Sequence, residues 1–404
     1  LLFTLAKLDG RSYQETVDAA NQDYSFIGEI VELPESVSRN KATAQSLSGT
    51  LPYRDFLLAA DCVADKELTE RQASIDAMDP ALLVYTSGST GKPKGALISH
   101  YGLCFGASVQ HAHYGIQRPK MLCSFPINHV ACVADTCCLN LVAGGTLIFQ
   151  ARFDAAAVLK ALKEEQITVL LAVPTMLLMV LEHPDFDPAL FESSQLIAWG
   201  GATLPVATIK HLQTLAPRLM NVYGLTETAA NTTYTSINAD LIELSETIGR
   251  PSPHMPCRIV DAEGKECAVG EEGELQFKGE YLLLEYLNRP EATRDVYTDD
   301  GWLHTGDLGY WREEGTITLV GRMSDMYKSG GYNVYPREIE NLLESHPAVE
   351  LAAVVGVPDD RFQEVGAAFV VSAHPVDVAQ LKAHCVKHLA NYKIPKTFTL
   401  VDQL

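Results

Sequence analysis

Residues 85–95 form the run YTSGSTGKPKG, which combines hydroxyl side chains, glycines and two lysines. Hydroxyls, glycine amides and a lysine charge are the donors that proteins use to hold phosphate oxygens. The common nucleotide-binding signature GxxxxGK[ST] needs four residues between its first Gly and its Gly-Lys pair. Here only two residues separate Gly88 from Gly91, and Pro93 follows Lys92. The run therefore indicates a phosphate-gripping loop of another kind, with a flexible surface loop as the alternative.

A second polar run, NVYGLTETAAN, occupies residues 221–231 and directly follows an apolar stretch. It brings an aromatic face, a tight turn, a hydroxyl and a carboxylate together. Thr226 and Glu227 supply the hard oxygen ligands that could position Mg²⁺ on a polyphosphate. The alternative is a plain helix start, with Thr226 as the N-cap and Glu227 in the first turn.

Two further runs lie later in the chain, GWLHTGDLGYW at 301–311 and GRMSDMYKSGGYNVYPREIE at 321–340. Asp307 stands between glycines and could accept two ribose hydroxyls in a bidentate grip, or be an ordinary β-turn Asp. The last run joins a cation, Arg322, to a Gly-Gly pair and to a helix that starts at Pro336. Taken alone it is typical of an interdomain linker, which does not exclude a function.

The elements that must position these residues alternate between amphipathic helices and short apolar strands. AVLKALKEEQ (157–166) precedes ITVLLAV (167–173), and IKHLQTLAP (209–217) precedes LMNVYG (219–224). This alternation predicts an α/β fold with parallel sheets covered by helices on both faces. Ligands in such sheets bind at the carboxyl ends of strands, and the polar runs follow apolar stretches as that rule requires.

Past residue 255, short strands with glycine turns predict a β-rich subdomain at about 250–322. A helix and two strands of a small α+β domain are then expected at 336–346, 350–358 and 364–372. We predict a large N-terminal domain over residues 1–322 and a small mobile C-terminal domain over 323–404, with a linker near 322–326.

Bulk composition excludes several classes of protein. The 404 residues carry a formal charge of −20, which argues against nucleic acid as a partner. The longest apolar run, residues 167–181, is too short to span a bilayer and contains Pro174. Nine cysteines, none in a CxxC spacing, fit free thiols in the cytoplasm better than a disulfide framework or a zinc site.

In order and in type, the four runs resemble the adenylate-forming superfamily of acyl-CoA synthetases, peptide-synthetase adenylation domains and firefly-type luciferases. The resemblance covers roughly residues 80–404, and the form SGGYNVYPREIE is similar to the acyl- and aryl-CoA ligase branch. It implies that ATP activates a carboxylic acid to acyl-AMP with release of pyrophosphate, and that CoA then accepts the acyl group. Loading of a carrier protein and a non-catalytic nucleotide-binding homologue remain as alternatives.

The resemblance also implies a role for each matching residue. The phosphates of ATP would be held by Ser87, Ser89, Thr90 and Lys94, and Mg²⁺ by Thr226 and Glu227. The adenine would be met by Asn221, Tyr223, Gly224 and the backbone of Gly200, Gly201 and Ala202. The ribose would be bound by Asp307 and Arg322. The acyl carboxylate would lie beside His129, and the pantetheine would pass Gly330 and Gly331, where only hydrogen side chains leave room.

The acid itself is not specified, but Val130, Val133, Trp199 and Asn231 predict a mostly apolar pocket. No aspartate stands out there as a partner for an amino acid's ammonium. A homodimer is compatible with the sequence.

The chain departs from the family's pattern at its hinge and at its ends. Ser324 stands at the hinge, where Asp or Lys is common in the family. The family's adenylation lysine belongs to a Gly-Lys motif that would follow the last residues, and Lys393 and Lys396 precede that place. The phosphate loop also begins early, so we expect a chain truncated at both ends.

Overall fold

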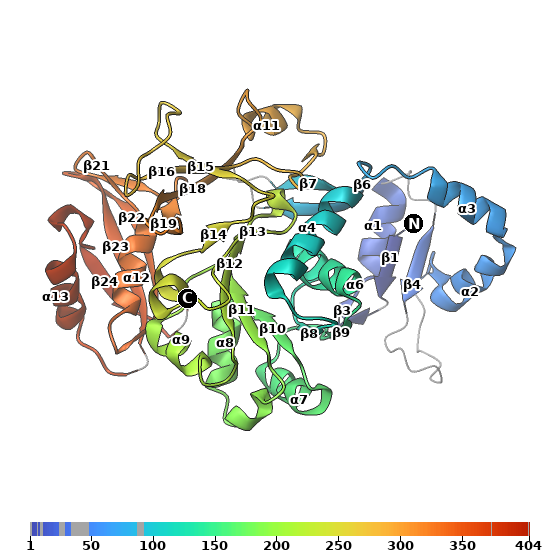
Figure 1. Ribbon diagram of the computed structural model, residues 1–404, viewed down its shortest axis with the longest axis horizontal. Coiled ribbons are helices and arrows are strands. Elements are labelled where there is room, and N and C mark those ends of the chain that lie inside the picture. The colour runs from blue at the N-terminus through green and yellow to red at the C-terminus, as the bar shows by residue number, and fades with distance from the viewer. Residues whose placement is uncertain are drawn as a thin grey trace. The chain divides into compact units, whose positions relative to one another are not determined.

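The computed structural model describes residues 2–5, 7–8, 11–23, 29–33, 48–86, 93–372, 374–402 and 404. The chain divides into two compact units, Leu1–Asp76 and Ala77–Leu404, each described here by itself. Figure 1 labels their helices and strands. Ser87, Ser89 and Thr90 of the predicted phosphate loop lie outside the described residues.

The first unit contains a small parallel sheet with strand order β1-β4-β5. The strands of this unit are β1 (Leu2–Leu5), β2 (Lys7–Leu8), β3 (Arg11–Ser12), β4 (Ile30–Leu33) and β5 (Leu51–Pro52). Strands β2 and β3 pair antiparallel with each other, outside the parallel sheet. Its helices are α1 (Gln14–Asp23), α2 (Tyr53–Leu58), the 3₁₀ turn η1 (Ala59–Cys62) and α3 (Asp65–Ala73).

A seven-stranded sheet with order β14-β13-β12-β11-β10-β8-β9 forms the centre of the second unit. Its strands are β8 (Lys120–Cys123), β9 (Thr146–Phe149), β10 (Val169–Ala172), β11 (Leu196–Gly200), β12 (Leu219–Gly224), β13 (Asn231–Tyr234) and β14 (Arg250–Pro251). The strands β8 to β12 pair in parallel, whereas β13 and β14 add antiparallel to the edge. This is the predicted α/β architecture, and β12 has the predicted bounds.

Helices bury both faces of this sheet, as its wholly apolar strands require. Leu170 and Ala172 pack in one core cluster with α7, α8 and α9, while Val169 and Leu171 pack in another with α4 and α6. The two sets of helices can be followed in Figure 1. The helical segments here are α4 (His100–Tyr114), α5 (Val130–Cys132), the π-helix η2 (Val133–Cys138), α6 (Leu139–Ala143), α7 (Ala155–Glu165), α8 (Pro174–Leu181), η3 (Pro188–Phe191), α9 (Val206–Leu212) and α10 (Leu241–Glu246).

Two antiparallel sheets make up the β-rich part of the second unit. One has the order β17-β7-β6 and the other β15-β16-β18-β19. Their strands are β6 (Pro80–Thr86), β7 (Lys94–Ser99), β15 (Cys257–Val260), β16 (Gly273–Phe277), β17 (Glu285–Tyr286), β18 (Leu303–Trp311) and β19 (Ile317–Arg322), with η4 (Thr226–Thr228) and α11 (Pro290–Asp295) nearby in sequence.

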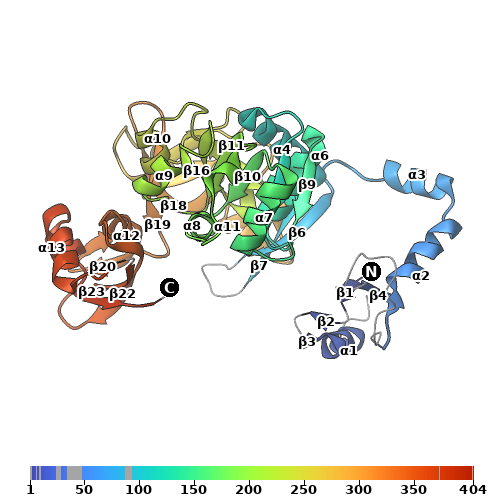
Figure 2. The same ribbon diagram turned by 90° about the horizontal axis from the view of Figure 1, so that it is seen from below.

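The last part of the chain has its own sheet and its own core. The sheet has the order β21-β20-β23-β22, with β24 paired to β23. A core cluster of its own holds Val354, Val370 and Leu381. The elements, grouped together in Figure 2, are β20 (Tyr327–Ser329), β21 (Tyr332–Val334), α12 (Pro336–Glu344), β22 (Val349–Asp359), β23 (Gln363–Ser372), α13 (Val378–His388), η5 (Asn391–Lys393) and β24 (Thr397–Leu400). The predicted helix and two strands are therefore present, and the predicted boundary at residue 322 remains a prediction.

In the part of the chain that the structure describes, no helix has the length and apolarity needed to cross a membrane.

Candidate active site

A cleft with a volume of about 1600 Å³ opens beside the carboxyl ends of β11 and β12. The position agrees with the rule that parallel sheets bind ligands at that edge. The helix α12 forms part of its wall, and the Arg337 guanidinium donates a 2.6 Å hydrogen bond to Thr203 Oγ1. The predicted site residues that line the cleft are Gly201, Ala202, Asn221, Tyr223, Gly224, Asp307 and Arg322.

Asp307 is a buried carboxylate of the cleft with a partner on each oxygen. Its Oδ2 accepts a 2.6 Å hydrogen bond from the Tyr223 hydroxyl, and its Oδ1 lies 2.8 Å from Arg322 Nε. The residue is only 4% exposed, and burial raises the pKa of Asp307 although Arg322 acts in the opposite direction. Each carboxylate oxygen has two lone pairs, so both oxygens can still accept a ligand hydroxyl.

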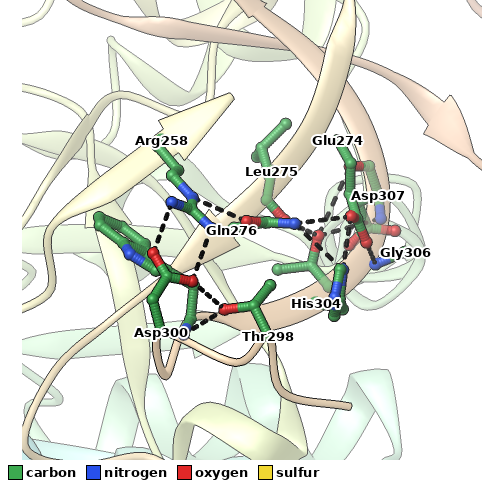
Figure 3. A network of polar contacts seen from close by, with 11 residues as sticks. Arg258, Glu274, Leu275, Gln276, Thr298, Asp300, His304, Gly306 and Asp307 are labelled. Carbon is green, nitrogen blue, oxygen red and sulfur yellow. Dashed lines mark hydrogen bonds and ion pairs between the residues drawn. The ribbon is translucent and has the colours of Figure 1, made fainter. Parts of the chain in front are cut away.

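A polar network fixes the part of β18 that carries Asp307 (Figure 3). The Asp307 amide donates to Thr305 Oγ1 at 3.0 Å, and the Gly306 amide donates to Glu274 Oε1 at 3.1 Å. His304 Nδ1 lies 2.7 Å from the other oxygen of Glu274. The network continues through Gln276 to Arg258. These bonds hold the backbone at Asp307 in one position before any ligand binds.

The ends of β11 and β12 approach each other too closely for side chains. A Cβ atom on Gly200 would lie 2.8 Å from the Val222 carbonyl oxygen, and Gly201 has a φ of +86°. The neighbouring Asn221 is buried, and its Nδ2 donates to the Thr247 carbonyl at 2.8 Å. That bond leaves Asn221 Oδ1 as the acceptor end of the amide, which suits a ligand amino group.

Lys94 and Glu227 both contact one tyrosine, Tyr286, that the motifs did not include. The Tyr286 hydroxyl donates to Glu227 Oε1 at 2.6 Å, and Lys94 Nζ lies 5.1 Å from the Tyr286 ring centroid. Thr226 is adjacent in the 3₁₀ turn η4. Sequence reasoning missed Tyr286 because its run, LLLEYLNRP, carries no cluster of polar residues.

His129 begins the helical segment that precedes α6. It is exposed, and its Nδ1 accepts a 3.1 Å hydrogen bond from the Ala131 amide. The π-helix η2 follows, and in it the buried Asp135 accepts a 3.2 Å hydrogen bond from Asn231 Nδ2. Burial raises the pKa of Asp135 to about 8. A buried aspartate thus does contact one of the residues expected to line the acid pocket.

Trp199 is buried in the core and is not among the residues that line the cleft, contrary to the sequence expectation. Its side chain is 0% exposed and belongs to the core cluster that packs against α7 to α9. The alternation of side chains along β11 explains the difference, because Trp199 points to the face of the sheet that packs against α7, α8 and α9.

Gly330 and Gly331 form the two-residue turn between β20 and β21. Their φ angles are +59° and +87°, the left-handed values that a tight hairpin turn needs at both positions. The Gly330 amide donates to the Phe362 carbonyl at 2.8 Å. The hairpin alone therefore accounts for two glycines, whether or not a ligand passes them.

Comparison with known proteins shows the family to which the chain belongs. A model of AMP-binding enzymes matches residues 17–287, and a model of the C-terminal domain of AMP-binding enzymes matches residues 338–404. The chain therefore belongs to the AMP-binding enzyme family.

Relatives with assigned activities are similar over most of this chain. A feruloyl-CoA synthase from Amycolatopsis sp is 36% identical over 346 residues, which are 84% of this chain and 69% of that protein. A 2-succinylbenzoate–CoA ligase from Bacillus licheniformis is 33% identical, over 82% of this chain and 68% of that protein.

The fold is shared with solved structures of the same family. The o-succinylbenzoate CoA synthetase from Bacillus subtilis in complex with an acyl-adenylate intermediate has a TM-score of 0.76 at 28% identity. That comparison covers 100% of this chain and 80% of the other. The predicted superfamily, its CoA ligase branch, the enzyme class of acid–thiol ligase and the α/β fold are confirmed.

Proposed function

We propose that the protein joins a carboxylic acid to CoA in two ATP-dependent steps. In the first, a carboxylate oxygen attacks the α-phosphorus of ATP, the bond from that phosphorus to the bridging oxygen breaks, and pyrophosphate leaves. In the second, the CoA sulfur attacks the acyl carbon, its proton is lost, and AMP leaves. The observation that carries the proposal is Asp307, held between Tyr223 and Arg322 in a cleft large enough for a nucleotide.

The chain's residues bind and orient the nucleotide in this proposal. Asp307 and Arg322 take the ribose hydroxyls, because the carboxylate is already fixed by two partners and by the polar network around its part of β18. The adenine lies along the glycine-rich ends of β11 and β12, at Gly200, Gly201, Ala202, Tyr223 and Gly224, with its amino group toward Asn221 Oδ1. Ser87, Ser89, Thr90 and Lys94 keep their predicted role toward the phosphates.

Mg²⁺ fits the donor set of this site. Magnesium on a nucleotide is usually held by one or two protein oxygens plus phosphate oxygens, so a preformed cluster of ligands is not required. Thr226 and Glu227 would hold it, and the Glu227 carboxylate has one oxygen, Oε1, engaged by Tyr286. When bound, the ion supplies positive charge that neutralises the leaving pyrophosphate.

We propose His129 for the acyl site and the Gly330–Gly331 turn for the thiol site. His129 would lie beside the acid's carboxylate, and the Gly330–Gly331 turn would border the pantetheine path. The substrate class that fits is an aliphatic, alicyclic or aromatic acid, and relatives that act on ferulate and 2-succinylbenzoate support an aromatic one. A cytoplasmic location, a homodimer, the absence of nucleic acid partners and the domain boundary at 322–323 remain predictions.

The experiment that tests the function measures two half-reactions with a panel of carboxylic acids. We expect ATP–pyrophosphate exchange that depends on the acid, and loss of the CoA thiol only when acid and ATP are both present. If the protein binds a stable acyl-AMP mimic yet exchanges pyrophosphate with no acid, the ligase proposal is wrong. Exchange without CoA thiol loss would instead point to another acyl acceptor.

A further inference from the structure

Tyr286 contacts two groups that the proposed function uses for different purposes. Its hydroxyl donates to Glu227 Oε1 at 2.6 Å, and its ring lies under Lys94 Nζ at 5.1 Å. The residue is 4% exposed, so neither contact is an incidental surface encounter. The buried Tyr286 side chain thus contacts both Glu227, the proposed metal ligand, and Lys94, the proposed phosphate-binding lysine.

The backbone explains how one residue reaches both. Strand β17 pairs with β7 so that Tyr286 lies opposite Ala96, and the Leu287 amide donates to the Gly95 carbonyl at 2.8 Å. Three residues before Tyr286, the Leu283 amide donates to the Glu227 carbonyl at 2.7 Å. The segment from Leu283 to Leu287 is therefore fastened by main-chain bonds to the turn of Glu227 and to the strand of Lys94.

These contacts have one consequence for Glu227 and another for Lys94. A hydrogen bond to Oε1 orients the carboxylate and leaves Oε2 for a cation, since groups that hydrogen-bond a metal ligand fix its geometry. The same tyrosine holds Lys94 over its ring by a cation–π contact. Within the described residues, no ion pair joins Lys94 to Glu227, although both contact one side chain. A direct ion pair between them would engage the Glu227 carboxylate and the Lys94 ammonium with each other, so that neither would be available to metal or phosphate.

We propose that Tyr286 is a positioning residue that presents Glu227 to the magnesium ion and keeps Lys94 available for phosphate. The inference rests on the proposed function, because it assumes the role of Glu227 toward Mg²⁺. It assigns to Tyr286 a part in the adenylation step that none of the four sequence motifs contains.

The test compares Tyr286→Phe with Tyr114→Phe. Phenylalanine keeps the ring and loses only the hydroxyl. Tyr114 is a matched control, because it is also buried and its hydroxyl accepts a 3.0 Å hydrogen bond from Gln110 Nε2, with no contact to Glu227 or Lys94 among the described residues. In Tyr286→Phe we expect the Mg²⁺ concentration at half-maximal ATP–pyrophosphate exchange to rise by about 10-fold, as for other lost partners of metal ligands. The rate at saturating Mg²⁺ should stay within about 3-fold of the unmodified protein, because the ligand itself is retained.

A second readout does not depend on turnover. Binding of Mn²⁺ in the presence of α,β-methylene-ATP, followed by electron paramagnetic resonance, should weaken in Tyr286→Phe and remain unchanged in Tyr114→Phe. In a Glu227→Gln background, Tyr286→Phe should have no further effect on Mn²⁺ binding, since the two residues act through one contact.

Each contrary result has a distinct meaning. If the Mg²⁺ and Mn²⁺ dependences of Tyr286→Phe match those of Tyr114→Phe, the positioning role is wrong even when Glu227→Gln abolishes exchange. Fully additive effects of the two substitutions on Mn²⁺ binding also overturn it. If Glu227→Gln leaves exchange unchanged, the metal assignment within the proposed function fails, and the inference fails with it.

Discussion

At the scale of single residues, the proposed nucleotide and metal sites depend on carboxylates whose oxygens already have partners. Asp307 is bonded by Tyr223 and Arg322, and Glu227 by Tyr286. Preorganised charges of this kind need little reorganisation when a ligand binds, because the protein rather than water has already oriented them. The partners of the carboxylates therefore matter as much as the carboxylates themselves.

Replacing Tyr223 by Phe should separate this effect from packing. The substitution leaves one oxygen of the buried Asp307 without its donor, which costs about 1–3 kcal/mol of stability. We also expect the KM for ATP to rise by about 10-fold, corresponding to one lost hydrogen bond's worth of binding, with a smaller change in kcat. Steady-state kinetics with ATP as the varied substrate check this.

Tyr114→Phe is the control for that substitution, since its buried hydroxyl accepts a 3.0 Å hydrogen bond from Gln110 far from Asp307 in sequence. It should lower stability without changing the KM for ATP. Equal KM values in the two variants would contradict the role given to Tyr223.

The sequence located these residues unequally. Asp307, Arg322 and Tyr223 stand in runs of polar residues, so their types and order were sufficient to select them. Tyr286 and Glu274 stand in ordinary strands, and only the fold shows which groups their side chains reach. Trp199 was placed wrongly because a sequence next to a glycine turn does not reveal which face of the strand it occupies.

At the scale of elements, apolar periodicity predicted the sheet and its helices well. Strand β12 has the predicted bounds, and α8 starts at Pro174 directly after β10, where a proline is tolerated. Helix α9 ends at Leu212, earlier than expected, because helical turns of other kinds continue to Ala216. Strand order could not be predicted, since β8 lies between β9 and β10 and hydropathy carries no information on neighbours.

The hairpin turn at Gly330 allows a test of the pantetheine path. Asparagine tolerates the left-handed conformation, so Gly330→Asn should keep the turn while adding a side chain whose Cβ lies 3.3 Å from Phe362 Cδ1. We expect ATP–pyrophosphate exchange to be unchanged and thioester formation to slow by about 10-fold, as misplacement of a reacting group does.

Gly315→Asn is the matched control, because Gly315 also has a positive φ, +78°, and open space around its Cβ position. It should change neither half-reaction. If Gly330→Asn forms acyl-CoA as fast as Gly315→Asn, the glycine pair serves the hairpin alone.

At the scale of the whole molecule, one buried acid should dominate part of the pH dependence of stability. Asp135 has its pKa raised by burial from 3.8 to about 8. A raised pKa means that the folded state binds a proton that the unfolded state has lost. The contribution of this group to stability therefore falls as the pH rises from about 4 to about 8 and is constant above that range.

Asp135→Asn keeps the shape of the protonated side chain and cannot ionise. The melting temperature of the variant, relative to the unmodified protein, should increase between about pH 5 and about pH 8 by at least about 2 °C. Thermal unfolding followed by circular dichroism at both pH values measures the difference. A constant offset between the two proteins would show that Asp135 ionises normally in the fold.

The bond between Tyr223 and Asp307 joins the seven-stranded sheet to the four-stranded one, across 84 positions of the chain. During synthesis, the glycine-rich loop and Glu227 leave the ribosome well before Asp307 does, and domains generally fold as complete units. A nascent chain that ends before Arg322 contains every strand of the central sheet but lacks part of the proposed ribose grip. Nucleotide affinity should therefore arise late, together with the docking of the second sheet, so that ATP reports on complete folding and stabilises only the finished molecule.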